Sequence, residues 1–240
     1  ILRIASKLSV GEHRILAIEQ AFANSSEIIK LNNEFYTTKA IAEMEHGIVN
    51  TVTYGKQQLP SILSAEKVQQ EIARYELKQN FLLTNCQKQA VAHVLTTQDR
   101  IVAIQGDAGT GKTTMLDVVR TIAEQEKREI VGLSFTGKAA SEIEDASQIK
   151  SQTVAGMVHG QDNLHGKLVV IDEASMLSIK DMAAILNRCD NDTRVVLIGD
   201  TKQMQSIGQG KIFTSLQEKE AISTVRMSEV QRQKDANYKD

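Results

Sequence analysis

The sequence predicts an α/β fold in which a parallel sheet is flanked by helices, preceded by a small, mostly helical region. From about Leu83 onward, short apolar and β-branched runs alternate with helical stretches. Runs that are apolar throughout, such as residues 168–171, suit strands buried on both faces, as in a parallel sheet covered by helices. Before Leu83 helical periodicity predominates. We therefore expect an N-terminal region over residues 1–80 and an α/β lobe over residues 81–240.

The N-terminal region is expected to be helical and winged-helix-like, with one β-hairpin. Residues 27–31 and 34–36 read as two short strands around an Asn-Asn pair that tolerates positive φ. Helical spacing of apolar residues predicts helices over residues 9–23, around residues 41–48, and after Ser64, which can cap a helix. The apolar positions are Ile15, Ile18 and Phe22 in the first helix, Ile41 and Ile48 in the second, and Val68, Ile72 and Tyr75 in the third.

The α/β lobe is expected to contain five strands. They are residues 101–105, 130–135, 168–172, 194–199 and, more weakly, 221–225. The stretch from Gly55 to Pro60, which holds the only proline, is expected to join the two regions.

Composition limits the classes of protein and partner. The chain has 240 residues, of which 41% are hydrophobic, and no run is long enough to cross a bilayer, so we expect a cytoplasmic protein without a membrane segment. It begins with Ile rather than Met, so we expect a piece of a longer product. The formal charge of -2 excludes binding of nucleic acid by bulk electrostatics, so any DNA contact must be local. The two cysteines have no partners at disulfide-framework or zinc-site spacing.

A glycine-rich segment directly follows the strand expected at residues 101–105. It fits the phosphate-loop pattern G-x-x-x-x-G-K-[ST], which indicates a P-loop NTPase. Curled backbone lets successive N–H groups and the helix N-terminus face phosphates. We expect Lys112 to reach the β- and γ-phosphates of ATP and Thr113 to ligate Mg²⁺; a plain glycine turn would need neither residue. The expected nucleotide contacts are Gly106, Asp107, Ala108, Gly109, Thr110, Gly111, Lys112, Thr113 and Thr114.

Two further segments end apolar strands in polar residues. Asp172 and Glu173 follow residues 168–171, and we expect Asp172 to associate with Mg²⁺ and Glu173 to act as the base that polarises the attacking water. Residues 199–203, Gly-Asp-Thr-Lys-Gln, follow the next strand and suggest a γ-phosphate sensor. Each segment could be a simple loop in isolation. Ligands of open α/β sheets bind at the carboxyl ends of the strands, so we expect all three segments to meet at one site.

Six ordered segments resemble RecD-like superfamily one DNA helicases, most closely the helicase region of conjugative relaxases, the nickase-helicases of plasmid transfer. The resemblance covers about residues 27–240, more weakly before residue 80. The segments are Leu83-x-x-x-Gln87-x-x-Ala90, the phosphate loop, Thr136-Gly137-Lys138-Ala139-Ala140, Asp172-Glu173-Ala174-Ser175-Met176, Gly199-Asp200-Thr201-Lys202-Gln203, and Val230-Gln231-Arg232-Gln233.

The resemblance implies roles for residues that spacing alone does not assign. Gln87 would read the adenine, although Thr84-x-x-Gln87 is also a capping box, so both roles stay open. Gln203 would couple the γ-phosphate to DNA, and Arg232 would be an arginine finger. Contacts to single-stranded DNA would come from Thr136, Lys138 and Thr153.

The resemblance also implies an activity and further partners. The chain would be the ATP-hydrolysing lobe of a DNA helicase that acts in single-stranded DNA transfer, with a second RecA-like lobe and a relaxase domain in the full-length protein. This lobe alone would be barely active. Three alternatives remain: a P-loop ATPase or nucleotide switch that never touches DNA, a RecD-like exonuclease-associated helicase outside conjugation, and a scaffold with a vestigial site.

Overall fold

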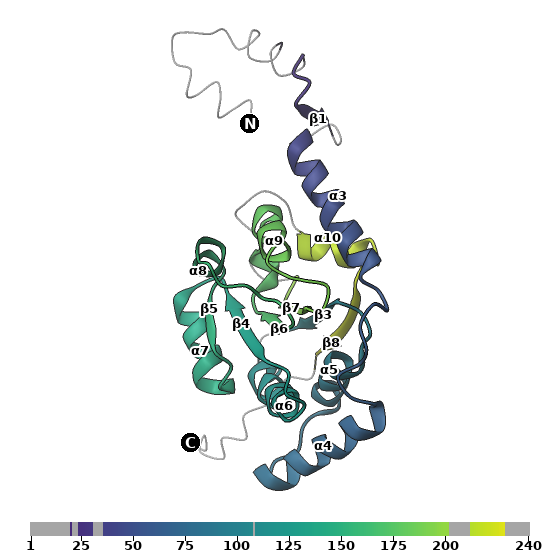
Figure 1. Ribbon diagram of the computed structural model, residues 1–240, viewed down its shortest axis with the longest axis vertical. Helices are drawn as coiled ribbons and strands as arrows, with labels where there is room; N and C mark the ends of the chain where they lie inside the picture. The colour runs from purple at the N-terminus through teal and green to yellow at the C-terminus, as the bar shows by residue number, and fades with distance from the viewer. Residues whose placement is uncertain (1–19, 21–23, 31–35, 108, 202–211, 229–240) are drawn as a thin grey trace, which may run out of the picture. The chain divides into compact units, whose positions relative to one another are not determined.

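A computed structural model describes residues 20, 24–30, 36–107, 109–201 and 212–228 of the chain (Figure 1). The chain divides into two compact units, Ile1–Gly47 and Ile48–Asp240. The helix expected at residues 9–23 lies outside the described residues except for Gln20. No helix among the described residues is both long and apolar enough to span a membrane.

The first unit contains the expected hairpin. Strand β1 (Ile28–Lys30) pairs antiparallel with β2 (Tyr36–Thr38), with Ile28 opposite Thr38. Strand β2 covers residues 36–38, and residues 34 and 35 of the expected strand 34–36 lie outside the described residues. Helix α3 (Lys39–Tyr54) follows directly, and the Thr38 hydroxyl accepts a hydrogen bond from the Ile41 N–H at 3.3 Å.

Two helices precede the sheet of the second unit. The Ser64 hydroxyl caps α4 (Ala65–Gln79), which buries Val68, Ile72 and Tyr75 as expected. Helix α5 (Asn85–Thr96) follows, and both helices contribute to the same apolar core as the sheet. The segment from Gly55 to Pro60 is hydrogen-bonded to residues 98–100 within this unit. Residues 48–80 thus pack with the lobe, and the domain boundary expected near residue 80 stays a prediction.

The sheet of the second unit has six parallel strands in the order β5-β4-β6-β7-β3-β8. All residues of β3, β6 and β7 are buried, as expected for central parallel strands. The short strand β5 was not expected from the sequence. The strands are β3 (Ile101–Gly106), β4 (Ile130–Ser134), β5 (Ser151–Thr153), β6 (Leu168–Ile171), β7 (Arg194–Gly199) and β8 (Ser223–Met227).

Helices cover both faces of this sheet (Figure 1). Alternate strand residues, among them Val102, Ile104, Val170 and Ile198, share one core with α4, α5 and α6. Helices α8 and α9 pack against each other, as do α10 and the short 3-10 turn η1. The bounds are α6 (Lys112–Gln125), α7 (Gly137–Ser147), α8 (Val154–His159), η1 (Ala174–Met176), α9 (Ile179–Leu186) and α10 (Ile212–Glu218).

Candidate nucleotide-binding site

The phosphate loop connects the carboxyl end of β3 to the first turn of α6. Gly109 and Gly111 adopt φ values of 75° and 74°, a region that side chains disfavour. Between them Thr110 is fully buried, and its hydroxyl donates a hydrogen bond to the Asp107 carbonyl at 2.8 Å. Ala108 lies outside the described residues. The loop is thus curled as a phosphate-binding backbone must be.

The Lys112 side chain folds back over this loop. Its ammonium donates hydrogen bonds to the Gly106 carbonyl at 3.1 Å and, more weakly, to the Asp107 carbonyl at 3.5 Å. A Cβ atom on Gly106 would lie 2.9 Å from Lys112 Cδ, so only glycine leaves room for this path. Thr113 and Thr114 are half-buried in the first helical turn. The cationic group and two hydroxyls therefore stand at one helix N-terminus, which itself favours anions.

The two expected carboxylates leave the end of β6. The Asp172 N–H donates to the Leu133 carbonyl at 2.9 Å, and the Asp172 carboxylate accepts from the Glu173 N–H at 2.9 Å. Glu173 has a φ of 56°, a conformation unusual for a residue with a side chain. The buried Ser134 hydroxyl, at the end of neighbouring β4, lies 3.5 Å from Glu173 Oε2.

The positive charge of Lys112 acts on the pKa of both carboxylates. Burial raises the pKa of Asp172, and the positive charge of Lys112 opposes this rise. Burial also raises the pKa of Glu173, the negative charge of Asp172 adds to the rise, and the Ser134 hydroxyl and Lys112 oppose it. An acid whose pKa is raised towards neutrality is suited to accept a proton from water.

The end of β7 lies between these two groups, because β7 separates β6 from β3 in the sheet. Gln105, the penultimate residue of β3, donates from Nε2 to Asp200 Oδ1 at 3.0 Å and accepts from the Thr201 N–H at 3.3 Å. Sequence reasoning did not single out Gln105, although a buried amide at the end of an apolar strand was a usable signal. Lys202 and Gln203 lie outside the described residues.

Gln87 is fully buried in the first turn of α5. Its Oε1 accepts from the Thr84 N–H at 2.9 Å, and the Thr84 hydroxyl accepts from the Gln87 N–H at 3.3 Å, which confirms the capping box. Its Nε2 donates to the Gly111 carbonyl of the phosphate loop at 3.1 Å. The expected contact to adenine stays a prediction.

The residues expected to contact DNA lie at the carboxyl ends of neighbouring strands. Thr136 and Thr153 cap α7 and α8, and their hydroxyls accept from the backbone N–H groups three residues on, at 3.1 and 3.0 Å. The Lys138 side chain is 87% exposed and lies 3.7 Å from Glu142. Capping explains both threonines structurally, so their DNA role stays a prediction. Arg232 lies outside the described residues.

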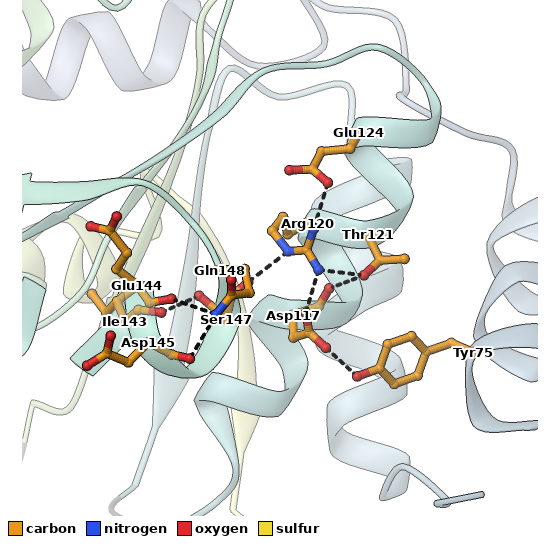
Figure 2. A network of polar contacts seen from close by, with 10 residues as sticks. All are labelled: Tyr75, Asp117, Arg120, Thr121, Glu124, Ile143, Glu144, Asp145, Ser147 and Gln148. Carbon is orange, nitrogen blue, oxygen red and sulfur yellow. Dashed lines mark hydrogen bonds and ion pairs between the residues drawn. The ribbon is translucent and has the colours of Figure 1, made fainter. Parts of the chain in front are cut away.

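A polar network anchors the middle of α6, beyond the first turn that adjoins the phosphate loop (Figure 2). Arg120 donates to Asp117 at 2.9 Å, to Glu124 at 2.6 Å and to the Ser147 carbonyl of α7 at 2.7 Å. Asp117 also accepts from the Tyr75 hydroxyl of α4 at 2.5 Å. The network thereby ties the helix that begins at the phosphate loop to α4 and to α7.

Comparison with known proteins agrees with this geometry. Residues 82–240 match the protein family described as an AAA domain. The chain belongs to this family. The AAA domain contains the phosphate loop, both carboxylates and the end of β7, which are the segments that form the candidate site.

Individual relatives confirm the resemblance to relaxases and RecD-like helicases. The chain is 30% identical over 210 residues to the multifunctional conjugation protein TraI of Escherichia coli K12, covering 82% of this chain and 11% of TraI. It is 29% identical over 143 residues to the ATP-dependent RecD2 DNA helicase of Deinococcus radiodurans, covering 56% and 20%. The crystal structure of Pif1 helicase from Candida albicans aligns with 20% identity and a TM-score of 0.45, covering 64% and 41%. The chain thus spans less than half of the length of each of these proteins.

Proposed function

We propose that this chain is the ATP-binding and ATP-hydrolysing lobe of a DNA helicase, and that it serves in the transfer of single-stranded DNA during conjugation. The observation that carries the proposal is the meeting of the phosphate loop, the Asp172-Glu173 pair and the end of β7 at one edge of a parallel sheet. A glycine turn or an acidic loop would not bring the Lys112 charge close enough to act on both carboxylates.

Each residue of the candidate site has a separate role in the proposed binding and hydrolysis of ATP. Backbone N–H groups of the loop and Lys112 hold the phosphates of ATP, while Thr113 and Asp172 supply oxygen ligands of the kind that Mg²⁺ prefers. When bound, Mg²⁺ neutralises charge that develops on the phosphates. Glu173 orients the attacking water and draws off its proton. Gln203 and Arg232 keep the sensor and finger roles that the helicase resemblance implies.

The conjugative assignment is supported by the similarity to TraI, whose name describes a multifunctional conjugation protein. Because the chain spans 11% of TraI, we propose that a second RecA-like lobe and a relaxase domain act with it in the whole protein. A RecD-like helicase outside conjugation is the alternative that the similarity to RecD2 favours. Single-stranded DNA is the expected partner in both cases.

The test is steady-state ATP turnover by the full-length protein with and without single-stranded DNA. We expect DNA to stimulate turnover, and Lys138→Ala to weaken the stimulation most at low salt and less as salt rises, because the phosphate contact that the substitution removes is itself screened by salt. Turnover that is indifferent to DNA would instead favour a P-loop ATPase or nucleotide switch that never touches DNA. Absence of turnover in any condition would favour a scaffold with a vestigial site.

A further inference from the structure

Gln105 is a buried amide at the carboxyl end of a central strand. Strand β3 is buried along its whole length, and Gln105 itself is 4% exposed. A polar side chain in such a place destabilises the fold unless its hydrogen bonds are made. Both ends of the amide are engaged, because Nε2 donates to Asp200 Oδ1 at 3.0 Å and Oε1 accepts from the Thr201 N–H at 3.3 Å. An apolar residue would fill the same space without this requirement, so the amide indicates a role in holding these two residues.

The two residues that Gln105 holds begin the segment expected to sense the γ-phosphate. In the parallel register of β3 and β7, Gln105 lies opposite Gly199, so its side chain reaches the first two residues beyond β7. The first of them, Asp200, is only 7% exposed. The contact therefore joins the exit of β7 to the strand that leads into the phosphate loop.

The end of β7 is also packed from the side of the two carboxylates. A Cβ atom on Gly199 would lie 2.9 Å from the Ser175 nitrogen and 3.0 Å from Phe213 Cε1. The turn η1, which follows Glu173 directly, is therefore in close contact with this strand end, as is α10. The chain beyond β7 thus starts between the phosphate loop and the carboxylates.

The phosphate loop is held by contacts other than those of the Gln105 side chain. Its curl comes from the left-handed conformations of Gly109 and Gly111, and the Gly106 carbonyl holds the Lys112 ammonium at 3.1 Å. The two hydrogen bonds of the Gln105 amide go instead to the chain beyond β7. Loss of the amide should therefore displace that chain and leave the phosphate-binding backbone in place.

We propose that Gln105 is a positioning residue for ATP hydrolysis: its amide holds Asp200 and Thr201, the start of the expected γ-phosphate sensor, in place relative to the phosphate loop. The inference rests on the proposed function as an ATP-hydrolysing lobe. It predicts that loss of the amide slows hydrolysis of bound ATP and leaves the affinity for Mg·ATP unchanged, because misplaced groups around the reacting phosphate affect the chemical step. A residue that only stabilises the fold would change neither quantity or both alike.

The experiment compares Gln105→Met with the wild type in the full-length protein with single-stranded DNA present. Methionine keeps the buried volume and loses both hydrogen bonds. We expect the single-turnover rate of hydrolysis to fall about tenfold or more, while the Kd of a non-hydrolysable Mg·ATP analogue changes by less than about twofold. Gln79→Met is the matched control, because Gln79 is exposed at the end of α4. An unchanged rate in Gln105→Met, or a loss of affinity equal to the loss of rate, would overturn the proposal.

A reversal of hydrogen-bond polarity tests the contact with Asp200 itself. Gln105→Glu replaces the donor nitrogen, 3.0 Å from the Asp200 carboxylate, by an acidic oxygen, so hydrolysis should slow at about pH 9, where both carboxyls are ionised. In an Asp200→Asn background the new carboxylate can accept from the asparagine amide and still accept from the Thr201 N–H. The loss of rate caused by Gln105→Glu should therefore be at least about fivefold smaller in that background. Equal losses in the two backgrounds would overturn the proposal, because the two side chains would then act independently.

Two further measurements cover a misfolded variant and a wrong assignment of the site. In the ¹⁵N-labelled wild type, the Gln105 side-chain amide signal should shift more on binding Mg·ADP with aluminium fluoride, which takes the place of the γ-phosphate, than on binding Mg·ADP alone. Identical shifts would overturn the proposal even where Gln105→Met does not fold. Wild-type Mg·ATP affinity in Lys112→Ala would instead contradict the proposed function, and the inference with it, whatever Gln105 does.

Discussion

Glu173 combines a half-buried carboxylate with a left-handed backbone conformation at the end of β6. Its neighbours Asp172 and Ser134 change its pKa in opposite directions. Glu173→Gln preserves the shape of the side chain and removes the base. We expect ATP binding to persist while single-turnover hydrolysis falls by about 10² to 10⁴, the usual contribution of a general base. If binding and hydrolysis fell together, Glu173 would be holding the loop in place.

Gly106 is required by the path of Lys112. A Cβ atom there would lie 2.9 Å from Lys112 Cδ and 3.2 Å from Cγ. Because Lys112 is flexible, Gly106→Ala should displace the lysine and leave the fold intact, lowering Mg·ATP affinity about tenfold or more. Gly47→Ala is the matched control, since a Cβ atom there meets nothing within 4 Å. Calorimetric titration of both variants measures the effect, and equal affinities would show that Lys112 does not need this path.

At the scale of single residues, the sequence predicts which residues belong to the site better than it predicts their hydrogen-bond partners. Lys112, Asp172 and Glu173 were expected because their motifs fix them relative to strand ends. The capping box at Gln87 was also expected, since it is a local pattern. The bond from Gln87 to Gly111 joins residues 24 apart, and that from Gln105 to Asp200 joins residues 95 apart. Such contacts depend on how helices and strands pack, which no local spacing encodes.

Helix α4 is attached to α6 by a buried phenol. Tyr75 donates to Asp117, and burial together with this carboxylate raises the pKa of Tyr75 to about 12 (Figure 2). Tyr75→Phe removes the donor, and we expect the free energy of unfolding to fall by about 1 kcal/mol. Tyr54→Phe is the control, because Tyr54 is 78% exposed. Thermal unfolding should distinguish the two variants, and identical midpoints would show that the network adds no stability.

The contribution of the Tyr75–Asp117 contact to stability should decrease at high pH. The folded state favours the neutral phenol, so the contribution of Tyr75 is complete below its ordinary pKa of 10.0 and is lost as the pH rises towards 12. The difference in stability between wild type and Tyr75→Phe should therefore narrow over that range. A constant difference would mean that the phenol titrates normally.

Element prediction succeeded where apolar patterns are long. The five expected strands and the capped helix α4 are present, with ends that differ by one or two residues. Strand β5 was missed because its three residues, Ser-Gln-Thr, are polar and lie at the sheet edge, where burial imposes no apolar pattern. The segment from Gly55 to Pro60 had the composition of a linker, yet its backbone bonds to the lobe.

At the scale of the whole molecule, the described residues of the second unit contain a single six-stranded parallel sheet, which carries the phosphate loop. An arginine finger contributes about 10³ to 10⁵ in rate only when it is held against the γ-phosphate. We expect the 240-residue chain by itself to bind Mg·ATP, to turn it over very slowly and not to separate DNA strands. A strand-displacement assay with an Arg232→Ala control measures this; robust ATP-dependent unwinding would show that one lobe suffices.

The proposed function depends on binding of Mg·ATP by the phosphate loop through Lys112. Calorimetric titration of Mg·ATP into the wild-type chain and into Lys112→Ala tests this binding most directly. Titration measures binding alone, so its result does not depend on the further domains that we expect turnover to require. We expect saturable binding to one site in the wild type and an affinity at least about tenfold lower in the variant, since a charged hydrogen bond to phosphate is lost. Equal affinities in the two proteins, or no binding by the wild type, would show that the phosphate loop does not bind Mg·ATP through Lys112.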